Sequence, residues 1–319
     1  GIMGEVIAPV VNLAGEVYIA GGHTLTLQGG TSGSAANITQ LIQGADKKLP
    51  GYGNGNLVTD GYFTADLDKV QVPLENRGEM TLNQGTSTPS PITDMSKMTS
   101  IINSGTLNIG EGITLNKDIT NSGTMNISAG VTLDGSIANS GTMNLKTNLS
   151  GNTLLNTGTV SMEDAAHFEN GARIVGGTVN VNNNLEARTE NLLVETINIA
   201  DSKTLKIAGA PAVVDGFYDV FQSAVNSEQG KLEFTEGSLY ALSAINSKIV
   251  LDDNVNLNID ADNIKRDVEI GNNANLNLGD GQLRAGSITN NNGTVNFLGN
   301  VKVDGSLILP KANFASGSI

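Results

Sequence analysis

The sequence predicts an all-β fold, a three-sided parallel coil in which each full turn, here called a rung, takes about 18 residues. Two observations carry this prediction. The strings NSGTLNI, NSGTMNI and NSGTMNL recur at residues 103, 121 and 139, and short apolar–polar–apolar runs fill the space between them. A fixed period in this range is typical of repeat architectures, and alternation with period two is typical of half-buried strands.

The repeat can be followed through the threonine of the motif, with spacings of 18, 18, 17, 19 and 18 residues. Within one repeat the apolar residues fall in three short runs separated by Asn, Gly, Asp and Lys. We expect three strands and three bends per rung, with apolar side chains stacking on their copies above and below, because no rung buries its core alone. The threonines of the motif are Thr106, Thr124, Thr142, Thr159, Thr178 and Thr196.

The predicted hand of the coil is right-handed, with a left-handed β-helix as the alternative. An apolar residue at every sixth position from Leu107 to Leu155 resembles the hexapeptide rhythm of left-handed coils. A second apolar residue two positions later on many strands, the variable rung length after residue 155, and the general preference for right-handed crossovers favour a right-handed parallel β-helix.

Polar corner residues recur beside the strands. We expect stacked asparagines, Asn103, Asn121, Asn139 and Asn156, to hydrogen-bond along the coil. The neighbouring glycines, exemplified by Gly105 and Gly123, are expected to supply positive φ at the bend.

One continuous domain is predicted. Residues 1–100 are expected to form N-terminal capping rungs with an irregular insertion at 31–75 and a loop at 86–98. Residues 101–319 are expected to form rungs with a second irregular insertion at 209–243, and the chain is expected to be cut from a longer coil at its C-terminal end. Loops on a rigid scaffold often carry recognition, so their aromatic residues are either candidate contacts or side chains that pack over the end or side of the coil: Tyr52, Tyr62, Phe63, Phe217, Tyr218 and Phe221.

Composition disfavours several classes of function. The formal net charge of −14 disfavours nucleic-acid binding and an anionic membrane surface, and the absence of cysteine excludes disulfides and thiolate metal sites. The two histidines, His23 and His167, lack a partner at metal-binding spacing. The pairs Asp252–Asp253 and Asp260–Asp262 are interpreted as solvated turns rather than calcium sites. We therefore expect no metal and no cofactor.

The strings NSGTLNI, NTGTVSM, NNGTVNF and DGFYDVFQS resemble the passenger domains of bacterial autotransporter adhesins over most of residues 76–309. The resemblance implies a secreted right-handed β-helix, displayed extracellularly on the outer membrane through a C-terminal membrane barrel that is not among these residues. The GDSG sequence of the protease members is absent. The implied function is attachment to a host-cell surface protein or glycan, or to another copy of the same protein, without enzymatic activity.

The outward face of the repeat is the candidate interaction surface. Stacked rungs place uncharged threonine and asparagine side chains in two parallel columns, which favours either a solvated face or self-association. The alternatives to an adhesin are a carbohydrate-active enzyme on the same fold and a structural stalk for a distal binding domain. The candidate residues are Thr106, Asn108, Thr124, Asn126, Thr142, Asn144, Thr178, Asn180, Thr196 and Asn198.

Overall fold

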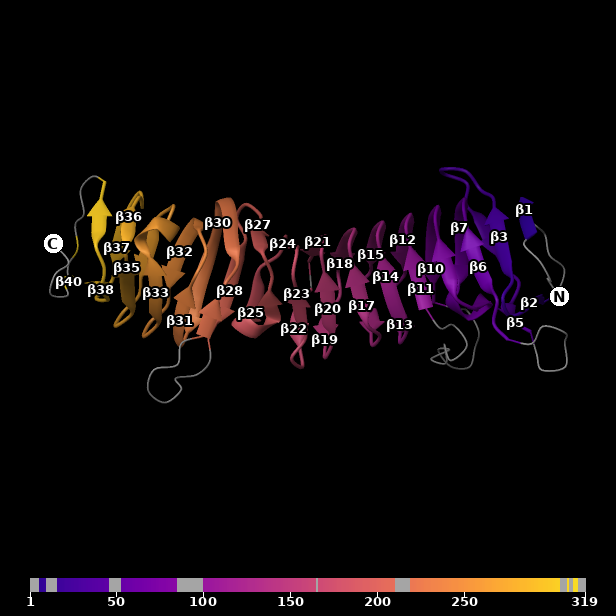
Figure 1. The fold of residues 1–319 in the computed structure, drawn as a ribbon, viewed down its shortest axis with the longest axis horizontal. Coiled ribbons are helices and arrows are strands. Elements are labelled where there is room, and N and C mark those ends of the chain that lie inside the picture. Colours follow the sequence, from indigo (N-terminus) through magenta and orange to yellow (C-terminus); the bar gives the residue numbers. More distant parts are fainter. Residues whose placement is uncertain are drawn as a thin grey trace. The chain divides into compact units, whose positions relative to one another are not determined.

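The computed structural model describes residues 6–9, 16–45, 53–84, 100–164, 166–209, 219–304, 309 and 312–314. The predicted loop at 86–98 lies outside these residues. Where the sequence predicted one domain, contacts divide the chain into two compact units, residues 1–160 and 161–319. Within each unit, strands of successive rungs lie side by side, as Figure 1 shows. Each unit is a parallel β-solenoid, which confirms the predicted fold class, whereas the hand of the coil stays a prediction.

Two long sheets form the main faces of unit 1. In the first, each strand pairs in parallel with its copy in the next rung; its members are β1 (Val6–Pro9), β3 (Thr24–Gln28), β6 (Asn56–Thr59), β9 (Leu74–Asn76), β11 (Ser100–Asn103), β14 (Asp118–Asn121), β17 (Ile137–Asn139) and β20 (Thr153–Asn156). The second contains β4 (Ala36–Ile38), β7 (Tyr62–Asp66), β10 (Glu79–Asn83), β12 (Thr106–Ile109), β15 (Thr124–Ile127) and β18 (Thr142–Leu145).

Shorter strands complete the rungs of unit 1. They are β2 (Val17–Ile19), β5 (Ile42–Gly44), β8 (Val70–Gln71), β13 (Thr114–Leu115), β16 (Thr132–Leu133) and β19 (Leu149–Ser150), with a 3-10 turn, η1 (Leu67–Lys69). The strand β21 (Thr159–Met162) contains the boundary between the units.

Unit 2 repeats the plan with rungs of less regular length. One face holds β24 (Thr178–Val181), β27 (Thr196–Ile199), β30 (Ala224–Glu236), β32 (Ile245–Leu251), β34 (Val268–Ile270) and β37 (Ile288–Asn290), with β25 (Leu185–Arg188) and β28 (Thr204–Ala208) joining at β30. A second holds β29 (Asp219–Phe221), β31 (Ser238–Ala241), β33 (Asn256–Asp260), β35 (Asn275–Gly279), β38 (Thr294–Phe297) and β40 (Ala312–Phe314).

The remaining elements of unit 2 are short. They are β22 (Phe168–Glu169), β23 (Arg173–Val175), β26 (Leu192–Leu193), β36 (Gly281–Leu283), β39 (Val301–Val303), η2 (Thr189–Asn191) and η3 (Ala261–Asn263). No α-helix occurs among the described residues.

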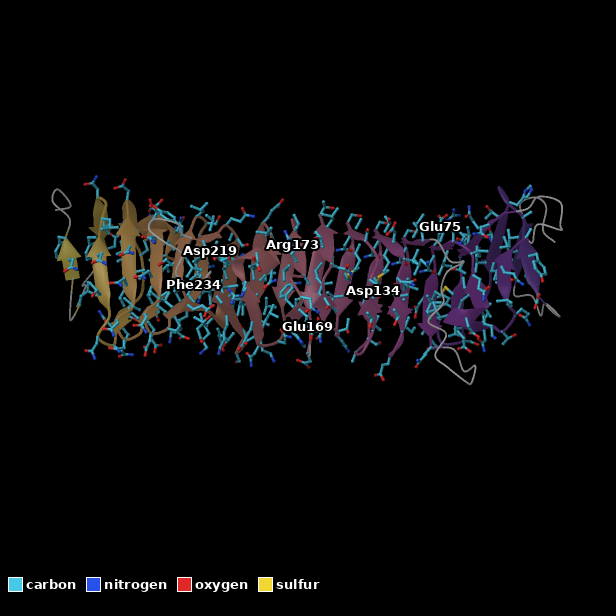
Figure 2. The ribbon with its side chains drawn as sticks, turned by 90° about the horizontal axis from the view of Figure 1, so that it is seen from below. Glu75, Asp134, Glu169, Arg173, Asp219 and Phe234 are labelled. Atoms are coloured by element: carbon cyan, nitrogen blue, oxygen red, sulfur yellow. The ribbon has the colours of Figure 1, made fainter. Side chains whose placement is uncertain are left out.

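The core follows the period-two pattern. In unit 1, Leu107, Met125 and Met143 form one inward column, and Ile109 and Ile127 continue a second beside it. All are at most 1% exposed, so the predicted inward positions are confirmed. Outward side chains at the edges of the ribbon often end in oxygen or nitrogen (Figure 2).

The prediction of an irregular insertion at 31–75 is wrong for the described residues. The strands β4 to β8 lie within this stretch and β9 begins in it, and Leu57 pairs with Leu25 on one side and Leu74 on the other. Phe63 pairs with Met80 in the same manner. The inward positions keep their alternation, so the rungs stay in register although Leu25 and Leu57 are 32 residues apart and Leu57 and Leu74 only 17.

The second predicted insertion, 209–243, is also wrong for residues 219–243. The strands β29, β30 and β31 pair with neighbouring rungs, and residues 210–218 lie outside the description. The strand β30 pairs with β27 through its first residues and with β28 through its later ones. The long strand β30 therefore pairs with two shorter strands, β27 and β28, and the additional residues of this rung form part of the sheet.

Candidate interaction surface

The outer ladder of unit 1 lies on three adjacent strands, β12, β15 and β18, whose residues are in exact register. Thr106 pairs with Thr124 and then Thr142, and the asparagines two positions later pair in the same way. All of these side chains are half-buried. The sequence reasoning that placed these residues in two parallel columns is therefore confirmed. The outer ladder of unit 1 comprises Thr106, Asn108, Thr124, Asn126, Thr142 and Asn144.

Amide side chains of this ladder are bonded to one another. Asn126 Nδ2 donates to Asn108 Oδ1 at 2.7 Å, and Asn144 Nδ2 donates to Asn126 Oδ1 at 2.7 Å. Asn108 Nδ2 also donates to Thr81 Oγ1 at 3.4 Å. An amide group has two N–H donors and two acceptor lone pairs. Bonding along the ladder aligns the amides and uses only part of this capacity.

The charged residues lie at the margins of this outer ladder. Glu79 is in register with Thr106 on the neighbouring strand, and Lys146 follows Asn144 by two positions. The six ladder residues themselves carry no charge, so the surface between these margins offers neutral donors and acceptors. A face of this kind can bind a complementary neutral polar surface without the desolvation cost of an ion.

A shorter outer ladder lies on unit 2. Thr178 pairs with Thr196 and Asn180 with Asn198, and Asn198 Nδ2 donates to Asn180 Oδ1 at 3.0 Å. Asn226 continues the column and donates to Asn198 at 3.4 Å. The repeat in the sequence does not predict Asn226 as part of this column, because the offset to Asn198 is 28 residues instead of 18.

Sequence reasoning also missed a third polar column, on β33, β35, β38 and β40. Asn277 donates to Asn258 at 3.1 Å, Asn296 to Asn277 at 2.7 Å, and Asn313 to Asn296 at 2.8 Å. The strings VNLNI, ANLNL and GTVNF contained the signal, an asparagine between two apolar residues in each strand.

Asparagines of the inner ladder have a different role. Asn103, Asn121 and Asn139 are at most 2% exposed, and each Nδ2 donates to the next Oδ1 at 2.7 to 2.8 Å. Asn121 Nδ2 also reaches the carbonyl oxygens of Gly123 and Thr142. The predicted corner ladder is confirmed, and its burial leaves it no surface for a partner.

The glycines beside this ladder do not serve as predicted. Gly105 and Gly123 do not have positive φ. A Cβ built on Gly123 would lie 2.1 Å from the carbonyl oxygen of Gly105, so glycine is required by the close approach of stacked backbones. Positive φ occurs instead at Gly112 and Gly130, in the next bend of each rung.

The predicted loop aromatics are mostly core or outside the description. Phe63 lies in β7 and is 3% exposed, and Tyr62 is half-buried beside it. Phe221 is 2% exposed and meets Phe234 edge to face, with ring centroids 5.7 Å apart. These three residues are therefore not free loop contacts, because each occupies a strand. Tyr52, Phe217 and Tyr218 lie outside the described residues.

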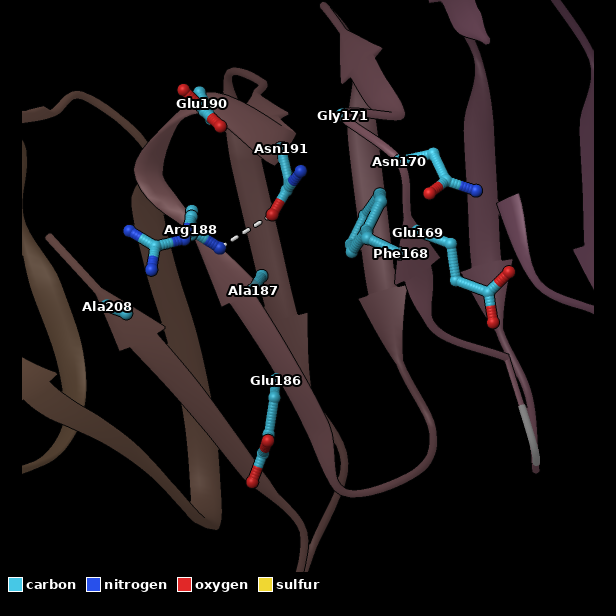
Figure 3. Close-up of a pocket in the computed structure, with 10 residues that line it drawn as sticks. All are labelled: Phe168, Glu169, Asn170, Gly171, Glu186, Ala187, Arg188, Glu190, Asn191 and Ala208. Carbon is cyan, nitrogen blue, oxygen red and sulfur yellow. Dashed lines mark hydrogen bonds between the residues drawn. The ribbon is translucent and has the colours of Figure 1, made fainter. Parts of the chain in front are cut away.

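A hollow of about 410 Å³ in unit 2 is lined by three glutamates and Arg188. Figure 3 shows the carboxylates of Glu169, Glu186 and Glu190 at different edges of it. Glu169 contacts His167 at 2.8 Å and Glu186 contacts Lys206 at 3.6 Å. Arg188 is held by its backbone N–H, which donates to Asn191, and by its guanidinium, which reaches Gly209 and Glu236.

One aspartate of each acidic pair considered for calcium accepts a backbone hydrogen bond at a turn. Asp253 accepts the backbone N–H of Asn272 at 2.7 Å, and Asp262 accepts that of Gln282 at 3.0 Å. Within the described ranges, no group of three or more His, Asp or Glu side chains is placed to hold a metal ion. Over the same residues, no helix is long and apolar enough to cross a bilayer.

Comparison of the chain with protein-family models, with curated proteins and with solved structures gives no match in any of the three. Functional inference therefore depends on the surfaces described above.

Proposed function

We propose that this chain is a non-enzymatic adhesive segment of a bacterial surface protein, which associates side by side with further copies of itself. The observation that carries the proposal is the outer ladder of unit 1, in which uncharged amide and hydroxyl groups recur in register on three strands. The resemblance of NSGTLNI and its copies to autotransporter passenger domains supports display outside the cell.

Association through this ladder depends on the number of hydrogen bonds that form between two copies. A neutral hydrogen bond contributes about 0.5–1.5 kcal/mol net, so one contact is negligible and several in register are required. Many copies displayed on one cell strengthen the attachment further, because each additional contact forms at a high effective concentration. The net charge of −14 opposes the approach of two copies. Salt should therefore strengthen association, because the Debye length falls from about 30 Å at 0.01 M to about 8 Å at 0.15 M.

The test is a triple variant, Asn108→Asp, Asn126→Asp and Asn144→Asp, compared with the unchanged protein by sedimentation equilibrium and by clumping of bacteria that display it. We expect the unchanged protein to associate and the variant to remain monomeric, because the variant places like charges on both facing ladders. The matched control, Thr120→Asp, Ala138→Asp and Thr153→Asp, adds the same charge to the exposed face of β14, β17 and β20.

Folding is checked by thermal melting monitored by circular dichroism. Since stacked aspartates could also disturb the rungs, a second variant, Thr106→Arg with Thr142→Arg, keeps the asparagines and blocks the face by bulk. Equal association of the unchanged protein and both folded ladder variants would show that the ladder is only a solvated surface. Such a result would favour a structural stalk.

The carbohydrate-active alternative has one observation in its favour, the hollow lined by Glu169, Glu186, Glu190 and Arg188. Paired carboxylates cleave glycosidic bonds when both flank the bond. The different orientations in Figure 3, and the partners of Glu169 and Glu186, do not favour this arrangement. Release of reducing ends or unsaturated sugars from a polysaccharide, abolished by Glu190→Gln, would establish an enzyme.

A further inference from the structure

A second hollow in unit 2, of about 290 Å³, gathers positive charge in an acidic protein. Lys203, Lys231, Lys248 and Arg266 line it, together with two acidic side chains, Glu228 and Asp267. The whole chain has 18 Lys and Arg residues against 32 Asp and Glu, so four of its 18 cations meet at one place. We call Lys203, Lys231, Lys248 and Arg266 with their surroundings the basic hollow.

The solenoid stacks these cations on successive rungs. Lys231 in β30 lies directly opposite Lys248 in β32, and the backbone N–H of Lys231 donates to the carbonyl oxygen of Lys203 at 3.0 Å. Like charges directly opposite each other on paired strands are destabilising. An anion seated between them would relieve this repulsion.

The lining holds four cations against two carboxylates, and two of the four cations are paired with carboxylates outside the lining. Lys248 contacts Glu269 at 2.8 Å, whereas Lys231 contacts Glu233 at 3.8 Å, and Glu233 is shared with Lys206 at 3.6 Å. Within the part of the chain that the structure describes, Lys203 and Arg266 form no ion pair with a carboxylate.

Arg266 is positioned by neutral acceptors. Its Nε donates to Asn246 Oδ1 at 3.1 Å and its Nη1 donates to the backbone oxygen of Glu228 at 3.0 Å. A guanidinium carries five N–H donors in a rigid fork that matches the geometry of oxyanions. The two bonds fix the guanidinium and leave donors for a bound ligand.

We propose that the basic hollow binds an anionic sugar, a glycan unit that carries a carboxylate or a sulfate ester. The cations select the anion, and Ser202, Thr204 and Gln229 in the same lining offer hydrogen bonds to sugar hydroxyls. The lining contains no aromatic side chain, which disfavours a hydrophobic ligand. The net charge of −14 repels a long polyanion such as a nucleic acid, whereas a short glycan unit brings only a few charges to the hollow.

This inference does not depend on self-association, because the basic hollow contains no outer-ladder residue. The test is titration calorimetry with a sulfated heparin tetrasaccharide, tetragalacturonate, neutral maltotetraose and sodium sulfate. We expect one or both anionic tetrasaccharides to bind, with affinity that falls as salt rises, and maltotetraose not to bind. Binding of sodium sulfate as tightly as the tetrasaccharides would overturn the assignment to a glycan.

Variants locate the site. Lys231→Gln with Lys248→Gln, and Arg266→Gln separately, should each weaken binding about tenfold or more, which corresponds to about 1.4 kcal/mol, because each variant loses charge-assisted hydrogen bonds to the anion. Lys117→Gln with Lys302→Gln removes the same charge elsewhere and should leave binding unchanged. Arg266→Lys keeps the charge without the fork and should bind with intermediate affinity.

The exposed pair between Lys248 and Glu269 contributes little to stability, so the variants are expected to fold, which their melting curves check. If no anionic tetrasaccharide binds the unchanged protein, or if the Lys117 and Lys302 control loses as much affinity as the hollow variants, the proposal is wrong. The second outcome would show attraction by overall charge alone.

Discussion

Asparagines five positions apart in the same repeat have different roles, although both form ladders. Asn121 is fully buried and bonds to two carbonyl oxygens and to the amide of Asn139. Asn126 is half-buried on the outer face and bonds to Asn108 and Asn144. Water can replace the lost bonds of Asn126 but cannot reach those of Asn121, because only the outer face is solvated.

Replacement of either asparagine by alanine tests this difference. Asn121→Ala leaves buried polar groups without partners and should lower the free energy of unfolding by about 2–3 kcal/mol, since each unsatisfied group costs about 1–3 kcal/mol. Asn126→Ala should cost less than about 1 kcal/mol. Urea denaturation measures both values, and equal losses would contradict the distinction between the inner and outer ladders.

A carboxylate in unit 2 makes stability depend on pH. Burial, and then the nearby charge of Glu233, raise the pKa of Asp252 above its ordinary value. A raised folded-state pKa means that the folded protein binds the proton more tightly, so stability falls as pH rises through that pKa. Below the unfolded-state pKa the carboxyl is protonated in both states and the penalty disappears.

Asp252→Asn removes this penalty. We expect the variant to melt at a higher temperature than the unchanged protein at pH 7, with a gain that shrinks as the pH falls below the ordinary range of an aspartate. Asp134→Asn, at an exposed position of unit 1, is the control for the replacement of an aspartate by asparagine itself. A gain at Asp252 that is the same at acidic and neutral pH would point to a cause other than ionisation.

At the scale of elements, the bends decide how closely the strands stack. The bend between β14 and β15 contains Gly123, whose missing side chain lets the backbone approach Gly105 of the rung beside it. The bend that follows β15 contains Gly130, which has φ of +70° and only a 3.8 Å contact for an added Cβ. Gly123 is required because a side chain would collide with the neighbouring rung, whereas Gly130 is required because its backbone has a positive φ.

Alanine at these two glycines separates the causes. Gly123→Ala should destabilise by about 3 kcal/mol, because backbone atoms cannot move aside without disturbing the ladder of hydrogen bonds. Gly130→Ala should cost about 1–2 kcal/mol, the strain of an L-residue in the left-handed region. Chemical denaturation compares the two, and a larger loss at Gly130 would refute the assignment of Gly123 to close approach.

The long strand β30 shows how an element absorbs irregularity. It has 13 residues and pairs with β32 along one side, with a register shift between Asn226 and Lys231. Gly230 lies inside this shift, and its N–H donates to Ser227 Oγ at 2.6 Å. The shift brings Lys231 opposite Lys248, so this irregular strand also forms the basic hollow.

For the whole molecule, the parallel pairing has a thermodynamic consequence. Each rung contacts mainly the rungs beside it, so stability is a sum of rung and neighbour terms instead of one cooperative core. Damage to one rung is therefore expected to stay local, and the two units are expected to respond separately.

Hydrogen exchange of the Asn121→Ala variant measures this locality. We expect faster exchange of backbone amides in β14, which contains the altered position, and in its neighbours β11 and β17. Exchange in β33 and β35 of unit 2 should not change. Equal acceleration throughout the described strands would show that the chain unfolds as one cooperative body.

The sequence alone was sufficient for the fold class, the inward positions and the inner and outer ladders of residues 101–160. Equivalent residues recur there at spacings of 17 or 18, so stacking one repeat on the next places each residue against its counterpart. The repeat in the sequence therefore predicts which residues of successive rungs are in contact. The stacked columns that contain Leu107, Asn103 and Asn108 follow directly.

Only the tertiary structure decided the contacts in those parts of the chain where the length of the repeat varies. It paired the strands within 31–75, brought Phe221 against Phe234, and placed Lys203, Lys231, Lys248 and Arg266 around one hollow. The separations between these residues follow no constant period. Their register is set by which buried side chains and backbone groups can be satisfied together across rungs of different length, a long-range condition that a local pattern does not contain.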